Sequence, residues 1–268
     1  MNSPDRQAFL PDIQSQVDGR GFTIDAVGVA GVRYPITLRA GHRLLPTVAT
    51  CAMTVELPAG VRGTHMSRFV ELLEATTEPL DPKGFQAMLD AMLKRLEAQH
   101  GTLEMRFAYF VTKTAPVSKV QSLLDYDVLW RAQRQADGAT SFHVQVNVPL
   151  TSLCPCSKEI SDYGAHNQRS NVRIEATLVG DMTVEELISV AERSASCEVY
   201  GLLKRPDEKY VTERAYDNPK FVEDLVRDVA VALDADARVG AFVVEAENFE
   251  SIHNHSAFAR IARQRQPK

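Results

Sequence analysis

Reactive side chains are concentrated in one segment of this sequence, residues 151–170. It reads TSLCPCSKEISDYGAHNQRS and contains Cys154, Cys156, Lys158, His166 and Arg169. A lysine or an imidazole close to a cysteine favours the thiolate, which is the nucleophilic and metal-binding form of the side chain. Two thiolates separated by one residue do not easily bind the same ion, so we expect one of them to be a ligand. The spacing alone does not say which, and both could instead be small buried residues at a strand end.

Two histidines near the C-terminus offer further candidate ligands. His253 and His255 flank Asn254 just after the last expected strand, where residues two apart in an extended chain can point the same way. A His-Asn-His sequence at the end of a sheet, in a chain with one cysteine-rich loop, suggests a metal site.

Charged residues between and within the C-terminal helices form a third candidate group. Lys204, Arg205 and Glu208 lie in the segment GLLKRPDEKY, whose ordinary interpretation is a solvated loop. Alternatively, the two cations could contact phosphates and Glu208 could bind a metal ion. Glu223 lies one turn into a helix, where a carboxylate is also favoured by the helix dipole.

The segment 151–170 joins two well-patterned strands. Apolar and polar side chains alternate over residues 142–150 and again over 172–178, which is typical of strands with one buried face. A connection of this length is too long for a simple hairpin, and such loops are usually functional or disordered. Its content of Cys, His, Tyr and Arg disfavours disorder, so we expect a functional loop.

The remaining pattern predicts one α+β unit used twice. Three helices are expected. One has Asp81 as its N-cap and Pro82 at its first position, one begins with the Thr183–Glu186 capping box, and one starts at Asn218-Pro219. Further strands are expected at 47–57, 103–114, 122–133 and 239–247, and a helix around 69–73. The order strand, two helices, strands, then strand, two helices, strand indicates antiparallel sheets with helices on one side.

Composition narrows the class of protein. The 268 residues include 30 Lys+Arg and 35 Asp+Glu, a net charge of -5 that argues against a nucleic-acid binder. The sequence contains no run of about 18 apolar residues, so we expect no membrane span. Four cysteines are too few for a disulfide framework, which favours a reducing cytoplasm. A Walker A loop, a dinucleotide fingerprint and a Gly-x-Ser-x-Gly elbow are all absent from the sequence, which disfavours ATPases, Rossmann dehydrogenases and α/β-hydrolases.

Several motifs together resemble those of the prokaryotic type IB GTP cyclohydrolases. They are SLCPCSK at 152–158, YGAHNQRS at 163–170, GTHMSRF at 63–69, KTAPVS at 113–118 and IHNH at 252–255. The resemblance covers residues 22–260 approximately. It implies the tunnelling fold, with two tandem modules at 23–135 and 136–268, each an antiparallel sheet with paired helices. Residues 1–22 are polar, contain Pro4 and Pro11 and show no steady periodicity, so we expect them to form a flexible N-terminal arm. The resemblance also implies assembly through the sheets into barrels, as a homotetramer with active sites at subunit interfaces.

The resemblance assigns roles to the candidate residues. Cys154, Glu208 and His253 are implied as metal ligands, with His166 as a fourth ligand or catalytic partner, and the motifs favour Cys154 over Cys156. This donor set would accept Zn, Mn or Fe. Glu223 resembles the glutamate that anchors the purine. Candidates for binding the triphosphate are Lys113, Lys158, Arg169, Lys204 and Arg205.

The implied reaction is the hydrolysis of GTP to 7,8-dihydroneopterin triphosphate and formate, the first step of tetrahydrofolate biosynthesis. A divalent metal would supply a nucleophile from water at neutral pH, and an imidazole such as that of His166 could move the protons. One alternative is a related reductase that reduces a deazaguanine nitrile with NADPH and uses a loop cysteine as nucleophile. Another is a purine- or pterin-binding member without activity. The joint presence of Cys154, His166, Glu208 and His253 weighs against simple binding.

Overall fold

One antiparallel sheet runs through the molecule. The computed structural model describes residues 12–14 and 16–264. The strands follow the order β1 (Ile24–Ala40), β2 (Arg43–Leu57), β3 (Gly101–Thr114), β4 (Gln121–Arg134), β5 (Thr140–Leu153), β6 (Asn167–Leu178), β8 (Val239–Asn248) and β9 (Ala257–Gln264). The two-residue strand β7 (Cys197–Glu198) pairs with the end of β5. Because β4 pairs directly with β5, the sheet continues from the N-terminal into the C-terminal half.

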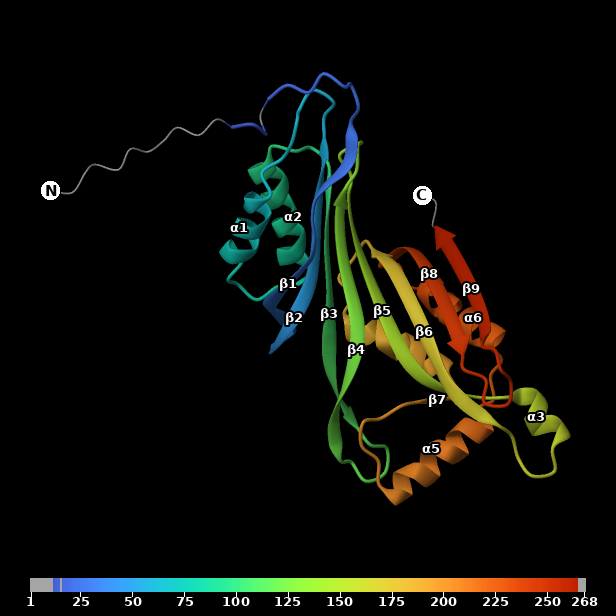
Figure 1. Cartoon of the computed structure of the whole chain (residues 1–268). Helices are drawn as coiled ribbons and strands as arrows, with labels where there is room; N and C mark the ends of the chain where they lie inside the picture. Colours follow the sequence, from blue (N-terminus) through green and yellow to red (C-terminus); the bar gives the residue numbers. More distant parts are fainter. Residues whose placement is uncertain (1–11, 15, 265–268) are drawn as a thin grey trace.

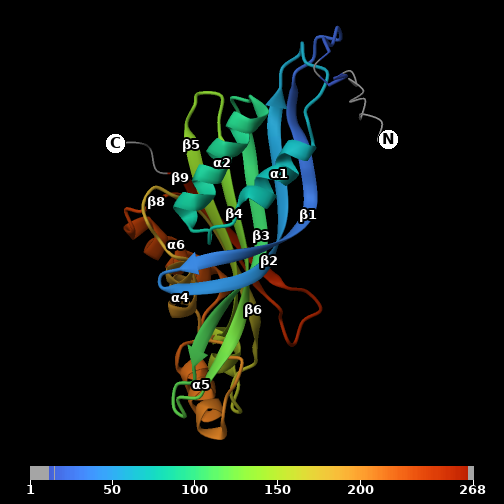
Figure 2. The ribbon, with the colours of Figure 1, turned by 90° about the vertical axis from the view of Figure 1, so that its left-hand side faces the viewer.

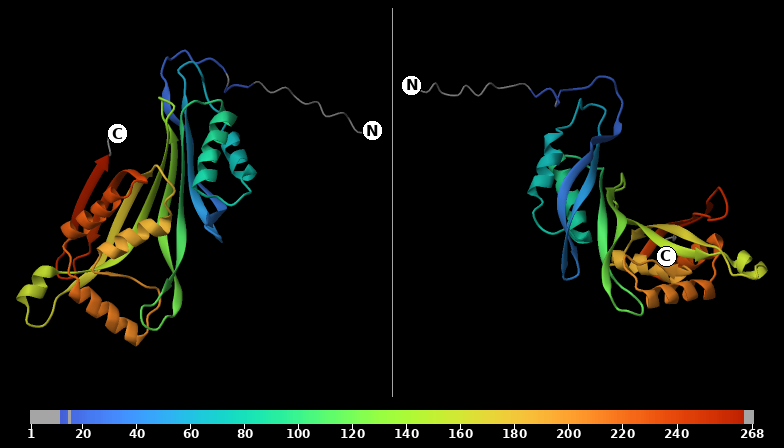
Figure 3. Two further views of the ribbon diagram at one scale, coloured as in Figure 1. Left: turned by 180° about the vertical axis from the view of Figure 1, so that it is seen from behind. Right: turned by 60° about the horizontal axis from the view of Figure 1, so that its bottom comes forward.

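Two pairs of helices cover one face of this bent sheet, as the two views of Figure 3 show. The helices are α1 (Ser67–Ala75), α2 (Pro82–Leu96), α3 (Pro155–Ile160), α4 (Val184–Ser194), α5 (Arg205–Asp217) and α6 (Val222–Ala235). α2 packs on β3 and β4, while α4 packs on β5 and α6 on β8 and β9. α3 and α5 lie apart from these pairs, at the end of the sheet where β5 finishes (Figures 1 and 2).

Apolar periodicity explains the strands and helices that the sequence predicts correctly. In β5 the alternate residues Phe142, Val144, Val146, Val148 and Leu150 are all buried. Asp81 caps α2, its carboxylate accepting a hydrogen bond from the backbone N–H of Gly84 at 2.7 Å. Thr183 and Glu186 form the expected capping box of α4. The core that these elements bury is one continuous cluster across both halves.

The opposite face of the sheet carries ion pairs between neighbouring strands. Arg131 of β4 lies 3.3 Å from Glu175 of β6 and also contacts Glu104 of β3. Arg173 of β6 pairs with Glu245 of β8 at 2.6 Å. This face is therefore polar, as the alternation of apolar and polar side chains predicts.

Five elements lie outside the sequence prediction, namely β1, β7, β9, α3 and α5. α3 is a short helix within the segment 151–170, where the sequence predicts a loop, and β7 has only two residues. β1 and β9 are edge strands, and β1 contains two register shifts, so neither shows a clean alternation of apolar side chains. α5 replaces the solvated loop expected at 201–210, and it buries only Asp207 and Ala215. A helix without an apolar stripe gives no periodic signal, which is why the sequence did not reveal it. α6 begins at Val222, a few residues after the predicted Asn218-Pro219 start.

The expected N-terminal arm lies partly outside the described residues, because residues 1–11 and 15 are not among them. Its described part runs beside residues 60–63. Asp18 donates its backbone N–H to the carbonyl of Gly60 at 3.1 Å, and Arg62 donates to Gln16 at the same distance. None of the helices in the described part of the chain is long and apolar enough to cross a membrane.

Candidate functional site

The base of the cysteine-rich loop holds Cys154 and His166 next to each other. β5 and β6 pair as far as Leu153 and Asn167, and the next residue on each side continues the contact. The backbone N–H of Cys154 donates to the carbonyl of His166 at 3.1 Å. The Ser157 hydroxyl bridges the two, donating to the carbonyl of Cys154 at 3.3 Å and accepting from the His166 N–H at 3.2 Å. The fold thus brings together the two residues predicted to be catalytic.

Cys154 is also the N-cap of α3. Its Sγ accepts a hydrogen bond from the backbone N–H of Ser157 at 3.5 Å, and Pro155 occupies the first position of the helix. Cys154 is half-buried, whereas Cys156 is exposed on the short helix.

The other two cysteines are poor candidates for chemistry. Cys51 and Cys197 are buried, and burial raises the pKa of the Cys51 thiol to about 11. Burial, reinforced by the nearby Glu198 carboxylate, raises the pKa of Cys197 to about 12. Both therefore stay protonated at neutral pH, which makes them poor nucleophiles and poor metal ligands.

The loop between β8 and β9 closes over His166. The imidazole Nδ1 lies 2.9 Å from Gln168 Oε1, 3.5 Å from Ser251 Oγ and 4.0 Å from Glu250 Oε2. The side chains of His166 and Glu250 are each only 13% exposed. The imidazole thus has a carboxylate and two other polar groups beside one ring nitrogen.

His253 lies on the same β8–β9 loop. Its ring stacks on that of His255, with the ring centroids 5.2 Å apart and the planes 14° apart. Both histidines are exposed. Because Glu250 and Ser251 of this loop contact His166, the loop carries His253 to the same end of the sheet as Cys154.

Buried hydroxyls fix the strands below the two loops. The Ser170 hydroxyl of β6 lies 2.7 Å from Ser152 Oγ of β5 and 2.7 Å from Asn248 Oδ1 of β8. All three residues are buried. Satisfied polar contacts of this kind hold neighbouring strands in a defined position.

The chain entering α6 and the C-terminal end of α5 both contact the region around Cys154. The backbone N–H of Lys220 donates to the carbonyl of Leu153 at 3.1 Å, so the chain entering α6 touches the residue before Cys154. Glu223, exposed in the first turn of α6, follows three residues later. Lys158 of α3 donates to the carbonyl of Tyr216 and lies 4.3 Å from the centre of its ring, so it is engaged with the C-terminal end of α5.

The first turn of α5 lies at the other end of that helix, beside the β3–β4 loop (Figure 1). It carries Lys204, Arg205 and Glu208, all exposed. Buried Asp207 fixes this turn, since its carboxylate accepts from the N–H groups of Val117 and Ser118 at 2.8 Å and from the Ser118 hydroxyl at 2.6 Å. Burial alone would raise the pKa of Asp207, but these hydrogen bonds outweigh it and hold the pKa well below its ordinary value.

The last two residues predicted to contact the substrate are Lys113 and Arg169, and they differ in exposure. Lys113 lies 2.6 Å from the Glu192 carboxylate, with side chains 13% and 14% exposed. The Tyr126 hydroxyl donates to the same carboxylate at 3.1 Å. Arg169 is exposed on β6, and its carbonyl accepts from the Phe249 N–H at 3.0 Å.

The predicted metal ligands are only partly gathered. Within the described residues, no three His, Cys, Asp or Glu side chains are grouped so that they could hold a metal ion. Thiolate, imidazole and carboxylate are donor types that fit a divalent transition metal. Cys154, His166 and the loop bearing His253 share one end of the sheet, whereas Glu208 lies at the far end of α5. A single chain thus brings three of the four predicted metal ligands to one end of the sheet, without Glu208.

The contacts of His166 with Gln168, Glu250 and Ser251 were not predicted from the sequence. Gln168 lies within a noted motif, but Glu250 and Ser251 reach the imidazole from another loop. No spacing rule connects residues 85 positions apart. Only the pairing of β6 with β8, which joins Ser170 to Asn248, brings the two loops together.

Comparison with known proteins gives the family and the fold. The family model described as "Type I GTP cyclohydrolase folE2" matches residues 10–259. The chain is 61% identical over 264 residues to GTP cyclohydrolase FolE2 of Paraburkholderia xenovorans, covering 98% of each chain. It is 59% identical over 261 residues to GTP cyclohydrolase FolE2 2 of Cupriavidus metallidurans, covering 97% of each.

Among solved structures, uricase from Arthrobacter globiformis aligns with a TM-score of 0.52 over 91% of this chain and 94% of that one, at 6% identity. Urate oxidase from Bacillus sp. TB-90 aligns with a TM-score of 0.50 over 90% and 100%, at 8% identity. This likeness concerns the fold alone, which is the tunnelling fold. The extent and identity of the sequence matches show that the chain belongs to the type I GTP cyclohydrolase FolE2 family.

Proposed function

We propose that this chain is a metal-dependent GTP cyclohydrolase that converts GTP and water into 7,8-dihydroneopterin triphosphate and formate, the first step of tetrahydrofolate biosynthesis. Family membership over nearly the whole chain supports the reaction. The observation that carries the location is the hydrogen-bonded arrangement of Cys154, Ser157 and His166 where β5 and β6 separate. It joins the backbones of Cys154 and His166 at the point where the β8–β9 loop contacts the imidazole.

The metal would be held by Cys154, Glu208 and His253, with His166 as a fourth ligand or as the catalytic partner. These sulfur, nitrogen and oxygen donors suit Zn, Mn or Fe. When bound, a divalent ion supplies Lewis acidity, which makes water a better nucleophile at neutral pH. Such an ion binds a cysteine as its thiolate, and Cys154 Sγ is already oriented by a hydrogen bond from the Ser157 N–H.

His166 is the residue best placed to move protons. Gln168, Ser251 and Glu250 lie around its Nδ1 and fix the orientation of the ring. The other ring nitrogen remains available to a ligand or to a reacting atom. An oriented imidazole can act as a general acid and base in hydrolysis of the imidazole ring of guanine and of the resulting formamide.

Substrate contacts are assigned by the functional groups of GTP. Glu223, exposed beside the Cys154 end of the sheet, can accept hydrogen bonds from the guanine N1–H and 2-amino group. Arg169, Lys204 and Arg205 are exposed cations that could bind the triphosphate. Lys158 and Lys113 are the weaker candidates, because Tyr216 and Glu192 already engage their ammonium groups.

The incomplete grouping of the ligands supports assembly. We assign the two halves, residues 23–135 and 136–268, as two tunnelling-fold modules that share one sheet. In a homotetramer, in which sheets join into barrels, Glu208 of a second copy would complete the metal site. The free state of all four cysteines favours the cytoplasm as the compartment.

Incubation with GTP in the absence of any reductant tests the reaction. We expect a product that becomes a fluorescent pterin on oxidation, together with one formate for each GTP consumed. A nitrile reductase would leave GTP unchanged and would consume NADPH when given a deazaguanine nitrile. A protein that only binds purines or pterins would bind GTP and release no formate, and either of these results would overturn the proposal.

A further inference from the structure

The first turn of α5 is attached to the β3–β4 loop through the carboxylate of Asp207, which is fully buried (Figure 1). Its Oδ1 accepts hydrogen bonds from the backbone N–H groups of Val117 and Ser118, each at 2.8 Å. Its Oδ2 accepts from the Ser118 hydroxyl at 2.6 Å and from the Lys204 N–H at 2.8 Å. One carboxylate thus caps its own helix and binds the neighbouring loop.

The β3–β4 loop is held in shape by hydrogen bonds of its own. The Ala115 N–H donates to the carbonyl of Val120 at 2.9 Å, and Lys119 Nζ donates to the carbonyl of Pro116 at 2.7 Å. Lys119 has a φ of 62°, in the left-handed region that residues other than glycine seldom adopt. This shape directs two consecutive N–H groups at one carboxylate oxygen. The loop includes the end of the KTAPVS motif at 113–118, and the contact with α5 gives that motif a structural role.

A buried carboxylate attaches a helix differently from an apolar side chain. Burial of a charge costs free energy, so an apolar residue would attach α5 at lower cost. Apolar packing is not directional, however, whereas hydrogen bonds from several fixed donors define how the helix is rotated and where it lies along its axis. Of the described residues of α5, only Asp207 and Ala215 are buried, so α5 has no apolar stripe to set its rotation.

The direction of Glu208 follows from this attachment. Glu208 is exposed and comes directly after Asp207. Successive residues of an α-helix point about 100° apart, so holding Asp207 against the loop fixes the direction in which Glu208 leaves the helix. Arg214, which lies 2.9 Å from Glu198, and Tyr216, whose carbonyl accepts from Lys158, attach the C-terminal half of α5 instead.

We propose that Asp207 and Ser118 are positioning residues of the metal site, which fix the first turn of α5 so that the Glu208 carboxylate is presented to the ion. Both act through Glu208 rather than by contact with the ion. This inference rests on the proposed function, in which Glu208 of one copy is a ligand in the site of another. Partners that orient a metal ligand typically contribute about 10- to 100-fold to metal affinity.

The affinity of the assembled full chain for Zn²⁺, measured by competition with a chromophoric chelator, tests the proposal without relying on turnover. Ser118→Ala removes the hydroxyl donor and is expected to raise the Kd for Zn²⁺ about 10-fold. Ser118→Thr keeps the hydroxyl and should stay within about threefold of the unaltered protein. Glu208→Ala removes the ligand itself and should raise the Kd further. Light scattering checks that each variant keeps the oligomeric state of the unaltered protein.

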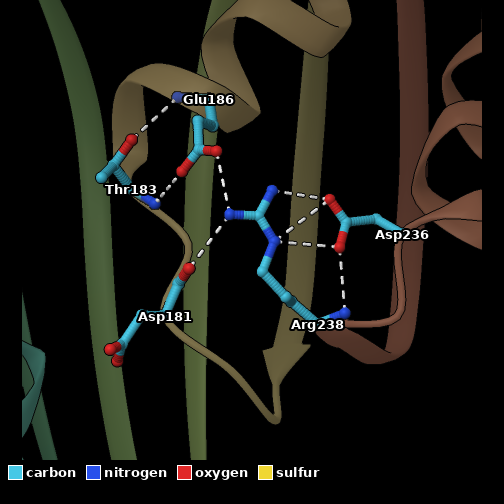
Figure 4. A network of polar contacts seen from close by, with 5 residues as sticks. All are labelled: Asp181, Thr183, Glu186, Asp236 and Arg238. Carbon is cyan, nitrogen blue, oxygen red and sulfur yellow. Dashed lines mark hydrogen bonds and ion pairs between the residues drawn. The ribbon is translucent and has the colours of Figure 1, made fainter.

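Thr183→Ala is the matched control, because it removes a hydroxyl at the start of a different helix. Figure 4 shows Thr183 in the network around Arg238, where the Thr183 hydroxyl accepts from the Glu186 N–H at 3.2 Å. Arg238 NH1 donates to Glu186 Oε1 at 2.9 Å and to the carbonyl of Asp181 at 3.0 Å. α4 carries none of the proposed metal ligands. Thr183→Ala is therefore expected to lower the melting temperature and to leave the Kd for Zn²⁺ within about twofold.

A double variant separates positioning from a general loss of stability. Because Ser118 acts through Glu208, the double variant of Ser118→Ala and Glu208→Ala should bind Zn²⁺ no more weakly than Glu208→Ala alone. Independent effects would multiply, which would make the double variant about 10-fold weaker than Glu208→Ala.

The outcomes distinguish the two levels of the account. A multiplied loss in the double variant, or undiminished affinity of Ser118→Ala beside a weakened Glu208→Ala, would overturn the positioning role and leave Glu208 as a ligand. Undiminished affinity of Glu208→Ala would overturn the assignment of Glu208 as a ligand, and the positioning role with it.

Discussion

At the scale of single residues, the structure separates the two loop cysteines that the sequence spacing leaves equivalent. Cys154 is half-buried, caps α3 and is hydrogen-bonded through its backbone to His166. Cys156 is exposed and takes no part in these contacts. The difference follows from one strand ending at Leu153, which places Cys154 at the helix N-terminus and turns Cys156 away.

Replacing these cysteines one at a time tests the assignment. Cys154→Ala is expected to lower GTP turnover by more than about 100-fold and to abolish metal binding while leaving the thermal unfolding cooperative, because it removes a ligand. Cys156→Ala is the control and should stay within about twofold of the unaltered protein. Turnover and metal content are measured on the same samples. Full activity of Cys154→Ala with stoichiometric metal would refute the role given to this thiol.

At the scale of elements, the buried carboxylate of Asp207 and the half-buried carboxylate of Glu192 attach helices to other parts of the fold. Asp207 fastens the first turn of α5 to the β3–β4 loop. Glu192 of α4 receives Lys113 of β3 and Tyr126 of β4. Both contacts join residues distant in sequence, and both position the surroundings of the candidate site.

Asp207→Asn is expected to destabilise the protein in a pH-dependent way. Because the hydrogen bonds hold the native pKa of Asp207 below the ordinary value of 3.8, its carboxylate stabilises the fold above that pH. Below pH 3.8 the unfolded chain takes up the proton first, so the contribution falls as the pH drops. The difference in melting temperature between the two proteins should therefore be largest at neutral pH and narrow toward pH 3. The exposed Asp217→Asn on the same helix is the control, and a difference that widened in acid would contradict this account.

The Lys113→Met variant tests whether Lys113 stabilises the fold or binds the triphosphate. Loss of the ammonium leaves the Glu192 carboxylate half-buried without its cation, which should lower the free energy of unfolding by about 1–3 kcal/mol. The double variant with Glu192→Gln should recover part of this loss. Denaturant unfolding gives the stability, and steady-state kinetics should show a KM for GTP within about twofold of the unaltered enzyme. A large rise in KM at unchanged stability would instead place Lys113 on the triphosphate.

At the scale of the whole molecule, the sequence predicts the repeated α+β pattern better than it predicts the edge strands of the sheet. β5 and α2 follow from alternation and a helical apolar stripe, and both are confirmed. β1 and β9 are missed because edge strands need no continuous apolar face, and α5 because its buried anchor is a carboxylate. The motifs gave Cys154 and His166, but the approach of Glu250 depends on strand pairing that no local pattern encodes.

Mixing two inactive variants tests whether the site is shared between copies. If Cys154 and Glu208 meet only across an interface, co-assembled Cys154→Ala and Glu208→Ala chains should regain about one quarter of the unaltered activity, since that fraction of sites receives both native residues. Each variant assembled alone should stay inactive. A site contained in one chain would remain broken in every mixed assembly. Complete absence of recovery in assemblies shown to contain both chains would refute a shared site.

The central claim is that GTP hydrolysis takes place at a metal centre that includes Cys154. The most direct measurement is an anaerobic GTP assay on protein stripped with a chelator, with Zn, Mn and Fe added back singly and pterin and formate quantified. We predict no product from the stripped protein, restored product with at least one ion, and none from Cys154→Ala with any of them. Undiminished turnover by protein verified to be free of metal would contradict the account.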